Sequence, residues 1–243
     1  MSFVHGSQGR VYLNGFDLSS FFKNATSNEE IGAHDTTGLG GPTARTFMPG
    51  LVDATLSVEG LFSAAVAAVN TVDAVLSAAT RDKGADVWAW LPSGDVDGAA
   101  GYSLLANVTT YEIESPVDDL VSVTAEAQSN VGLEPVLILH PLTARTTTAN
   151  GVARDNTLAT TQGGVGYLQV TAASGATPNL LVRIQHSVDG SAWVDLVPFT
   201  AVTVANRAQR LAVAGTVNRH VRAQWTITGT TPSFTFHAAF GRY

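Results

Sequence analysis

Apolar and polar residues alternate over residues 51–62, LVDATLSVEGLF, and this alternation predicts a β-strand with two different faces. One face is small or apolar: Ala54, Leu56, Val58, Gly60 and Phe62. The other face carries Asp53, Thr55, Ser57 and Glu59. The same pattern returns over residues 121–128, where a small-apolar set alternates with Ser122, Thr124, Glu126 and Gln128. Both strands should therefore bury one face and present an acidic, hydroxyl-rich face to water.

The period changes to that of a helix after the first of these strands. Val72, Val75, Leu76 and Ala79 follow the i, i+3, i+4, i+7 spacing of one helical face. Thr71 is a suitable N-cap residue for this segment. We therefore expect an amphipathic helix over about residues 71–82, with its backward extension into residues 63–70 left open.

Further strands are expected on both sides of the helix. Asn14-Gly15 lies between short apolar runs, which is a strong signal for a two-residue hairpin. Strands are also expected near residues 85–92, 102–115 and 117–130. Residues 24–50 have four glycines between positions 32 and 41, two prolines and no sustained period. A loop of this length is uncommon in a compact domain unless it is functional, so we expect an irregular, functional loop here.

The chain from residue 151 onward shows short strand patterns at roughly ten-residue spacing, as is typical of an antiparallel β-sandwich. Turn signals separate them at Ser174-Gly175, Asp189-Gly190, Gly229 and Pro232. Residues 132–150 contain two prolines and a threonine run and resemble a connector. The fold class is thus mainly β: a domain over residues 1–140 with one helix, a linker over 141–150, and a sandwich over 151–243.

The charge distribution divides the chain at the same place. Residues 1–140 hold 5 basic and 17 acidic residues, whereas residues 141–243 hold 8 Arg and 3 Asp, so the halves carry −12 and +5. The acidic half argues against tight nucleic-acid binding, which needs Lys and Arg to neutralise phosphates. The chain has no cysteine, so disulfides and thiolate metal sites are excluded. No apolar run approaches the ~20 residues of a membrane span, and we expect no membrane insertion.

Residue patterns for catalysis or metal binding are weak. His186, Ser187 and Asp189 are neighbours in sequence, but catalytic triads are assembled from separate elements, and no histidine pair has a metal-binding spacing. Asp95-Val96-Asp97-Gly98 lacks the remaining ligands of a calcium loop and is expected to be a solvated turn. We therefore expect no enzyme activity, no cofactor and no metal.

The polar strand faces allow two interpretations on periodicity alone: contact with solvent, or the lining of a water-filled lumen. Residues 28–78 resemble the major tail proteins, or tail tube proteins, of long, flexible-tailed bacteriophages. The resemblance rests on Thr36-Thr37, Arg45, Pro49-Gly50, Asp53 and Glu59-Gly60, followed by a small helix. The C-terminal half resembles β-sandwich domains appended to such proteins, through HSVDGSAWVDL and VNRHVRAQWTITGTTPSFTFHAAFGR.

The resemblance implies a structural virion protein that forms hexameric rings around a β-barrel, assembled in the host bacterial cytoplasm. Stacked rings would form a tube through which genomic DNA passes without specific binding. The expected partners are other copies of the chain, the tape measure protein, and the tail terminator and tip proteins. The residues expected to face the lumen are Asp53, Thr55, Ser57, Glu59, Ser122, Thr124, Glu126 and Gln128. The loop 24–50 would connect rings and become ordered on stacking, through Glu29, Glu30, Thr36, Thr37, Arg45 and Phe47.

An alternative is a carbohydrate-binding or adhesion module of a virion or cell surface. In that case the sandwich would present Trp193 or Trp225 to a glycan, since aromatic faces stack on sugar rings. Weak binding to host-surface glycans by the outer domain is compatible with the tail interpretation too. A glycosidase would need two carboxylates about 5–9.5 Å apart in a cleft, and the sequence spacing does not indicate such a pair.

Overall fold

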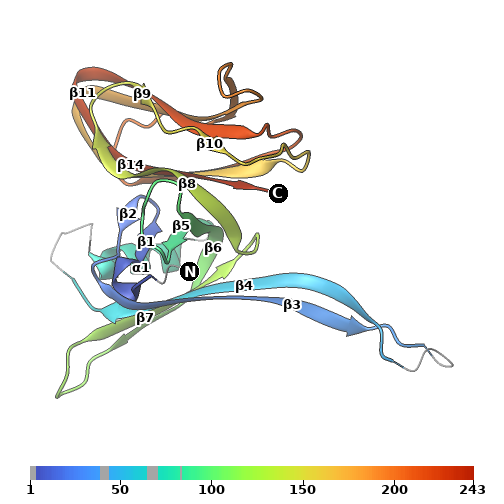
Figure 1. The fold of residues 1–243 in the computed structure, drawn as a ribbon. Coiled ribbons are helices and arrows are strands. Elements are labelled where there is room, and N and C mark those ends of the chain that lie inside the picture. The colour runs from blue at the N-terminus through green and yellow to red at the C-terminus, as the bar shows by residue number, and fades with distance from the viewer. Residues whose placement is uncertain (1–3, 39–43, 65–70, 83) are drawn as a thin grey trace.

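The computed structural model describes residues 4–38, 44–64, 71–82 and 84–243. The described residues form one hydrogen-bonded sheet system of fourteen strands and one α-helix, which confirms the predicted mainly β fold (Figure 1). The first half contains η1 (Gly6–Gln8), β1 (Arg10–Leu13), β2 (Phe16–Asp17), β3 (Phe22–Asp35), β4 (Phe47–Leu61), α1 (Val72–Arg81), β5 (Asp86–Leu91), β6 (Ala100–Glu114), β7 (Ser122–Ser129) and β8 (Glu134–Arg145). The second half contains β9 (Ala149–Asn150), β10 (Arg154–Asp155), β11 (Gly164–Ser187), β12 (Val194–Pro198), β13 (Arg207–Val213) and β14 (His220–Arg242).

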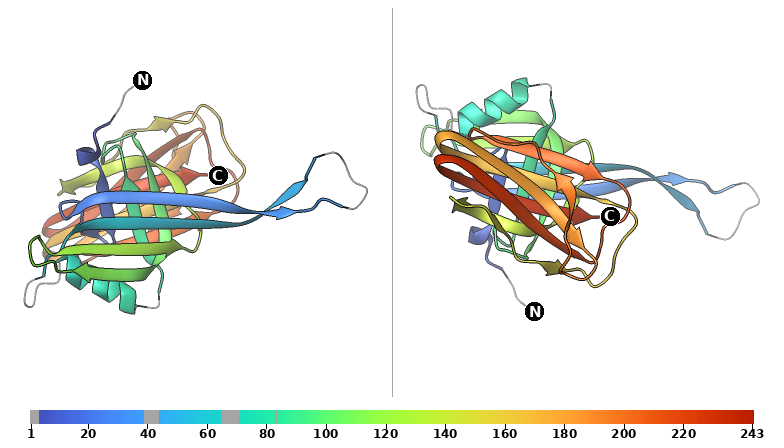
Figure 2. Two further views of the ribbon diagram at one scale, coloured as in Figure 1. Left: turned by 90° about the horizontal axis from the view of Figure 1, so that it is seen from below. Right: turned by 90° about the horizontal axis from the view of Figure 1, so that it is seen from above.

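The first half is built on an antiparallel layer in the order β3, β4, β7, β6 (Figure 2). The small-apolar residues of β4 and β7, such as Leu56 and Ala125, are buried on the inner side of this layer. Helix α1 and strands β1 and β5 pack on that same side and complete the core. The strand expected at 51–62 is therefore present, with its apolar face inward.

Helix α1 forms where its period predicts it. The Thr71 side chain caps the helix by accepting a hydrogen bond from the backbone N–H of Ala74 at 3.3 Å. The four residues that define the period, Val72, Val75, Leu76 and Ala79, are all buried. Residues 65–70, which decide whether the helix extends backward, lie outside the described residues.

The prediction of an irregular loop at residues 24–50 is wrong. Strands β3 and β4 pair from Phe22↔Gly60 out to Asp35↔Phe47 and form a long hairpin that projects from the body as an arm (Figures 1 and 2). Both faces of the arm are largely exposed from Glu30 and Asp53 outward, so its residues show no buried periodicity that the sequence could reveal. Gly40 and Gly41 lie outside the described residues.

The C-terminal half forms a sandwich, but from fewer and longer strands than expected. Strands β11 and β14 pair along nearly their whole lengths, with register shifts around Ser174–Asn179. At these bulges both strands pass from one layer to the other, and the core lies between the layers. Gly175 and Gly229 have φ of +112° and +127°, and a Cβ at either position would meet backbone atoms of the paired strand. The expected turns at 174–175 and 229–232 are therefore bulges in continuous strands, whereas Asp189-Gly190 does form a turn.

The expected connector is largely strand. Residues 141–145 end β8, which pairs with β6 in the first half and with β14 in the second, and Ala149–Asn150 forms β9. Because β8 is hydrogen-bonded to both halves, it joins them through a continuous sheet. The division into domains 1–140 and 151–243 stays a prediction.

Candidate functional site

The polar residues of β4 and β7 lie side by side on one face of the four-stranded layer. Their register pairs Thr55 with Gln128, Ser57 with Glu126, and Glu59 with Thr124. Strands β3 and β6 extend the same face on either side. The polar face comprises Asn24, Thr26, Asn28 and Glu30 of β3, Asp53, Thr55, Ser57 and Glu59 of β4, Ser122, Thr124, Glu126 and Gln128 of β7, and Asn107, Thr110, Glu112 and Glu114 of β6.

The polar face is acidic and carries no cation. Six of its sixteen residues are carboxylates, and none is Lys or Arg. Asp53 accepts a hydrogen bond from the Gln128 side chain, and the hydroxyl of neighbouring Thr109 donates to the Glu126 backbone carbonyl at 3.2 Å. Because no basic side chain on the face neutralises these carboxylates, their field extends into the space in front of the sheet.

The layer has an open edge on each side. Among the described residues, β3 pairs with β4 alone, and the part of β6 over residues 107–114 pairs with β7 alone. An unpaired edge presents a row of backbone donors and acceptors that can extend the sheet into another chain. The two open edges flank the polar face directly.

The arm carries the residues that the tail resemblance assigns to contacts between rings. Glu30, Thr36, Thr37, Arg45 and Phe47 are all exposed on it. Near the tip, the hydroxyls of Thr36 and Thr46 are 3.1 Å apart, and Thr37 Oγ1 accepts from the backbone N–H of Thr46 at 2.9 Å. The expectation that this region is disordered before assembly is therefore wrong for the described residues, because the hairpin is already paired in a single chain.

Exposed apolar side chains gather on the outer part of the arm. Leu51 is 89% exposed, and Ile31, Phe47, Met48 and Val52 are each more than half exposed. Large apolar side chains left in water on a projecting hairpin are typical of a surface that binds protein.

The two tryptophans expected to contact glycans lie in different settings. Trp225 is 2% exposed in the sandwich core, where its indole N–H donates to the Thr147 carbonyl at 3.0 Å. Trp193 is half-buried, and the Arg222 guanidinium lies 4.1 Å from its ring centre. Trp225 is therefore excluded as a sugar platform, and one ring face of Trp193 is covered by Arg222.

The Asp95 turn is not solvated as expected. Its carboxylate accepts hydrogen bonds from Tyr12 Oη at 2.9 Å, the Leu142 backbone N–H at 2.6 Å and His237 Nδ1 at 2.9 Å. Burial opposes ionisation, but His237 and these hydrogen bonds hold the pKa of Asp95 below its usual value. Asp95 therefore fastens β1, β8 and β14 together, and no sequence pattern pointed to it.

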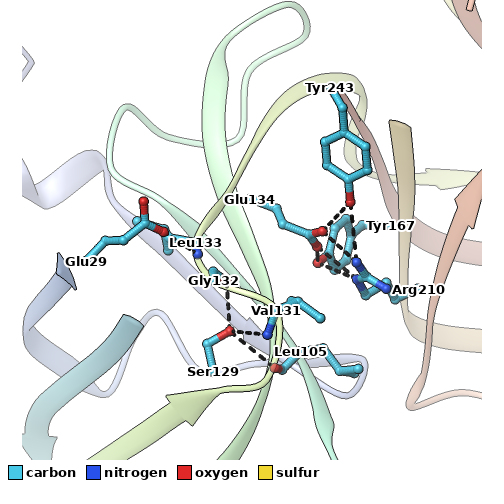
Figure 3. Close-up of polar contacts among 10 residues, drawn as sticks. All are labelled: Glu29, Leu105, Ser129, Val131, Gly132, Leu133, Glu134, Tyr167, Arg210 and Tyr243. Atoms are coloured by element: carbon cyan, nitrogen blue, oxygen red, sulfur yellow. Dashed lines mark hydrogen bonds and ion pairs between the residues drawn. The ribbon is translucent and has the colours of Figure 1, made fainter. Parts of the chain in front are cut away.

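A second polar cluster at the junction of the halves centres on Glu134 (Figure 3). Arg210 donates to both carboxylate oxygens of Glu134, at 2.8 Å from Nε and 2.5 Å from Nη2, and the Tyr167 and Tyr243 hydroxyls also donate. The adjacent Leu133 backbone N–H donates to Glu29 of β3 at 2.7 Å. The start of β8 thus holds the C-terminal sandwich on one side and the base of the arm on the other.

No three His, Asp or Glu side chains in the described ranges lie together as metal ligands. His186 accepts from the Asn218 backbone N–H at 3.2 Å, which is a structural role. No helix in the described part of the chain is long and apolar enough to span a membrane.

No protein-family model matches the sequence, and no curated protein matches it either. Several solved structures are similar in chain path, among them the following three. One is from the virion of a native gene transfer agent particle, with 16% identity, 53% of this chain and 95% of that chain covered, and a TM-score of 0.42. Another is from the tail of an empty gene transfer agent particle with C6 symmetry, with 16% identity, 46% and 80% covered, and a TM-score of 0.37.

The third is the SPP1 Dit (gp 19.1) protein, described as a paradigm of the hub adsorption apparatus in phages that infect Gram-positive bacteria. It has 12% identity, 96% of this chain and 99% of that chain covered, and a TM-score of 0.38. At these identities and TM-scores, the function of this chain has to be argued from its own residues.

Proposed function

We propose that this chain is the structural subunit of a phage-type tail tube, in which the polar face lines the lumen. The observation that supports this most is an acidic sheet face without a cation, flanked by two open strand edges. Such a sheet becomes a closed wall when several copies join edge to edge. The number of copies implied by the family resemblance is six.

The strand directions suit closure into a ring. The four strands alternate in direction, so β3 of one copy can lie antiparallel to β6 of the next. Four strands per copy keep the whole closed sheet antiparallel for any number of copies. Closure removes both exposed edges, which are otherwise templates for aggregation.

The chemistry of the face suits a conduit for DNA. Nucleic-acid affinity comes from Lys and Arg that displace the counterions of phosphates, and the polar face has neither residue. Its carboxylates repel phosphates, and its hydroxyls and amides keep the wall wetted. DNA would pass along such a wall without being held.

The arm and the sandwich take the remaining roles in this account. The exposed apolar residues of the arm would be buried against the adjacent ring when rings stack. The sandwich lies on the other side of the first-half core from the polar face and would therefore decorate the outside (Figure 1). The tape measure protein would occupy the lumen before DNA, and terminator and tip proteins would close the ends.

Charge reversal of the lumen tests the proposal. The double variant Asp53→Lys and Glu59→Lys should still form tubes visible by negative-stain electron microscopy, because both side chains are exposed. Virions built with it should eject DNA more slowly, since each copy gains cations that pair with phosphates. Normal ejection kinetics from a tube of this variant would contradict the lumen assignment.

Wild-type protein provides the control for assembly. It should form rings or tubes as its concentration rises or when the tail initiator complex is added. Protein that stays monomeric under both conditions would contradict the proposal. Single rings that never stack would keep the lumen but place the chain at one end of a tail rather than along it.

A further inference from the structure

A pocket of about 340 Å³ lies between α1 and the turn that joins β1 to β2. Its walls are largely apolar and include Phe16, Ala74, Val75 and Ala78. Its polar lining consists of Asn14 and two carboxylates, Asp82 and Asp86. This size is at the lower end for ligand pockets, and it fits one long side chain better than a large ligand.

Asp86 is the unusual residue of the pocket. It is only 3% exposed, yet its Oδ2 atom has no hydrogen-bond partner among the described residues. Its Oδ1 accepts from Asn14 Nδ2 at 2.6 Å, and Asn14 Oδ1 accepts from the backbone N–H of Val87 at 2.9 Å. The Asn14 side chain thus donates to Oδ1 and accepts from Val87, and it makes no hydrogen bond with Oδ2.

A buried carboxylate oxygen without a donor is costly, and a charged donor relieves that cost best. Burial, with a smaller contribution from the Asp82 charge, raises the pKa of Asp86 to about 6 against the hydrogen bond from Asn14. Arginine and lysine place an aliphatic stem along apolar walls and a cation at the end. The pocket combines apolar walls with a buried carboxylate, Asp86, and an exposed one, Asp82.

We propose that this pocket receives the Arg45 side chain from the arm of a second copy of the chain. Arg45 lies near the tip of the arm, and its side chain is 77% exposed. Its only described ion pair, with Asp35, spans 3.9 Å. The proposal rests on the assembly proposed above and specifies one contact within it.

Other arginines are already engaged within the chain. Arg145 donates to His140 and Arg222 to Gln185, whereas ion pairs hold Arg154, Arg183, Arg210 and Arg219. Arg242 donates to the Leu158 carbonyl at 2.7 Å. Lys23, Arg81 and Arg207 are exposed as well but lie on the body of the chain, whereas Arg45 lies near the tip of the projecting arm and is best placed to reach another copy.

The positions of the arm and the pocket suit a contact between copies. The arm extends to one side of the body, and α1 lies on the opposite side in all views (Figures 1 and 2). A patch at one end that fits a pocket at the other end is a heterologous contact, which propagates from copy to copy as a ring or a filament. The same arm in its own chain points away from the pocket.

Cross-linking between two variants tests the contact, and the absence of native cysteines makes it specific. Ala44→Cys chains, which keep Arg45, are mixed with Ala78→Cys chains, assembled, and treated with a short bismaleimide, and the linked peptides are identified by mass. We expect an Ala44→Cys to Ala78→Cys link that forms in assemblies and not in dilute monomer. The matched control replaces Ala78→Cys by Ser191→Cys at the outer hairpin and should give no link.

The charge requirement is tested separately. Asp86→Asn keeps the shape and the hydrogen bond to Asn14, and Arg45→Gln keeps the stem. Each should raise the concentration for half-maximal assembly about tenfold, as expected for loss of one charge-assisted hydrogen bond. The double variant should be no worse than either single variant, because both remove the same interaction.

The outcomes separate this inference from the proposed function. Assemblies that form without the link, or additive effects of Asp86→Asn and Arg45→Gln, would overturn the contact and leave the tube intact. A low pKa for Asp86 in the free chain, measured by NMR, would show that its charge is already paired and would also overturn the contact. Failure of the wild type to assemble would overturn the proposed function and this contact together.

Discussion

Acidic residues occur in two opposite settings in this chain. On the polar face, six carboxylates face open space without a cation among them. At the seam between the halves, Glu134, Asp95 and Asp97 are partnered by Arg210, His237 and Arg154. Glu134, Asp95 and Asp97 hold structural elements together, whereas the six carboxylates of the polar face make no ion pair within the four-stranded layer. The acids between the halves therefore serve the fold, and under the proposed function the acids of the polar face set the field in the lumen.

Removal of a seam acid should have the largest effect on stability. Glu134 is 7% exposed at its side chain, and Glu134→Ala leaves Arg210 and two tyrosine hydroxyls without their acceptor. Breaking one partner of a buried ion pair costs roughly 3–5 kcal/mol, and we expect this range for the free energy of unfolding in urea. Asp53→Asn on the polar face should change it by less than about 0.5 kcal/mol. Equal changes in the free energy of unfolding for Glu134→Ala and Asp53→Asn would contradict the different roles assigned to these two sets of acids.

A smaller, pH-dependent effect is expected from His140 in β8. Arg145 Nε donates to His140 Nε2 at 2.9 Å, so the ring carries its proton on Nδ1, facing the Phe236 carbonyl. Burial and the Arg145 charge lower the pKa of His140 to about 4. Between about pH 4 and pH 6.5, His140 is protonated in the unfolded chain and neutral in the folded chain. His140 therefore contributes stability that is complete above about pH 6.5 and is lost as the pH falls toward 4.

The size of this contribution is up to about 3 kcal/mol across that window. Asp86 acts in the opposite direction, because its pKa is raised to about 6 and its stabilisation is lost as the pH rises from about 4 to 6. The quantity to measure is therefore the difference in the free energy of unfolding between the wild type and His140→Gln, obtained by urea unfolding at several pH values. The wild type should gain stability relative to the variant between pH 4 and 6.5, and parallel curves would contradict the assignment.

Local patterns allowed prediction of the helix and of the two-faced strands. The caps and period of α1 lie within twelve consecutive residues, 71–82, and the alternation in β4 and β7 reflects a core on one side only. The paired polar face could be anticipated from these patterns, since each strand shows it independently. Its width could not, because β3 and β6 join it through contacts between distant segments.

The wrong expectations share a physical origin. The arm is exposed on both faces, so no hydrophobic period marks it as strand, and its glycines and prolines resemble those of a loop. In β11 and β14, the bulges at Gly175 and Gly229 use the same left-handed backbone as turns. The sequence therefore predicted two short strands where the structure has one long strand. Asp95 and Glu134 gave no signal, because their partners come from segments up to 142 residues away.

The most direct test of the polar face is its accessibility to a reagent that is too large to enter a tube. Thr55→Cys places the only thiol of the chain at the middle of this face, and Ser191→Cys places it on the outer hairpin. A maleimide on a bulky polymer should label both variants as free subunits. In assembled tubes, Ser191→Cys should keep its labelling rate and Thr55→Cys should be protected. Thr55→Cys that is labelled in tubes as fast as Ser191→Cys would show that the acidic face does not line the lumen.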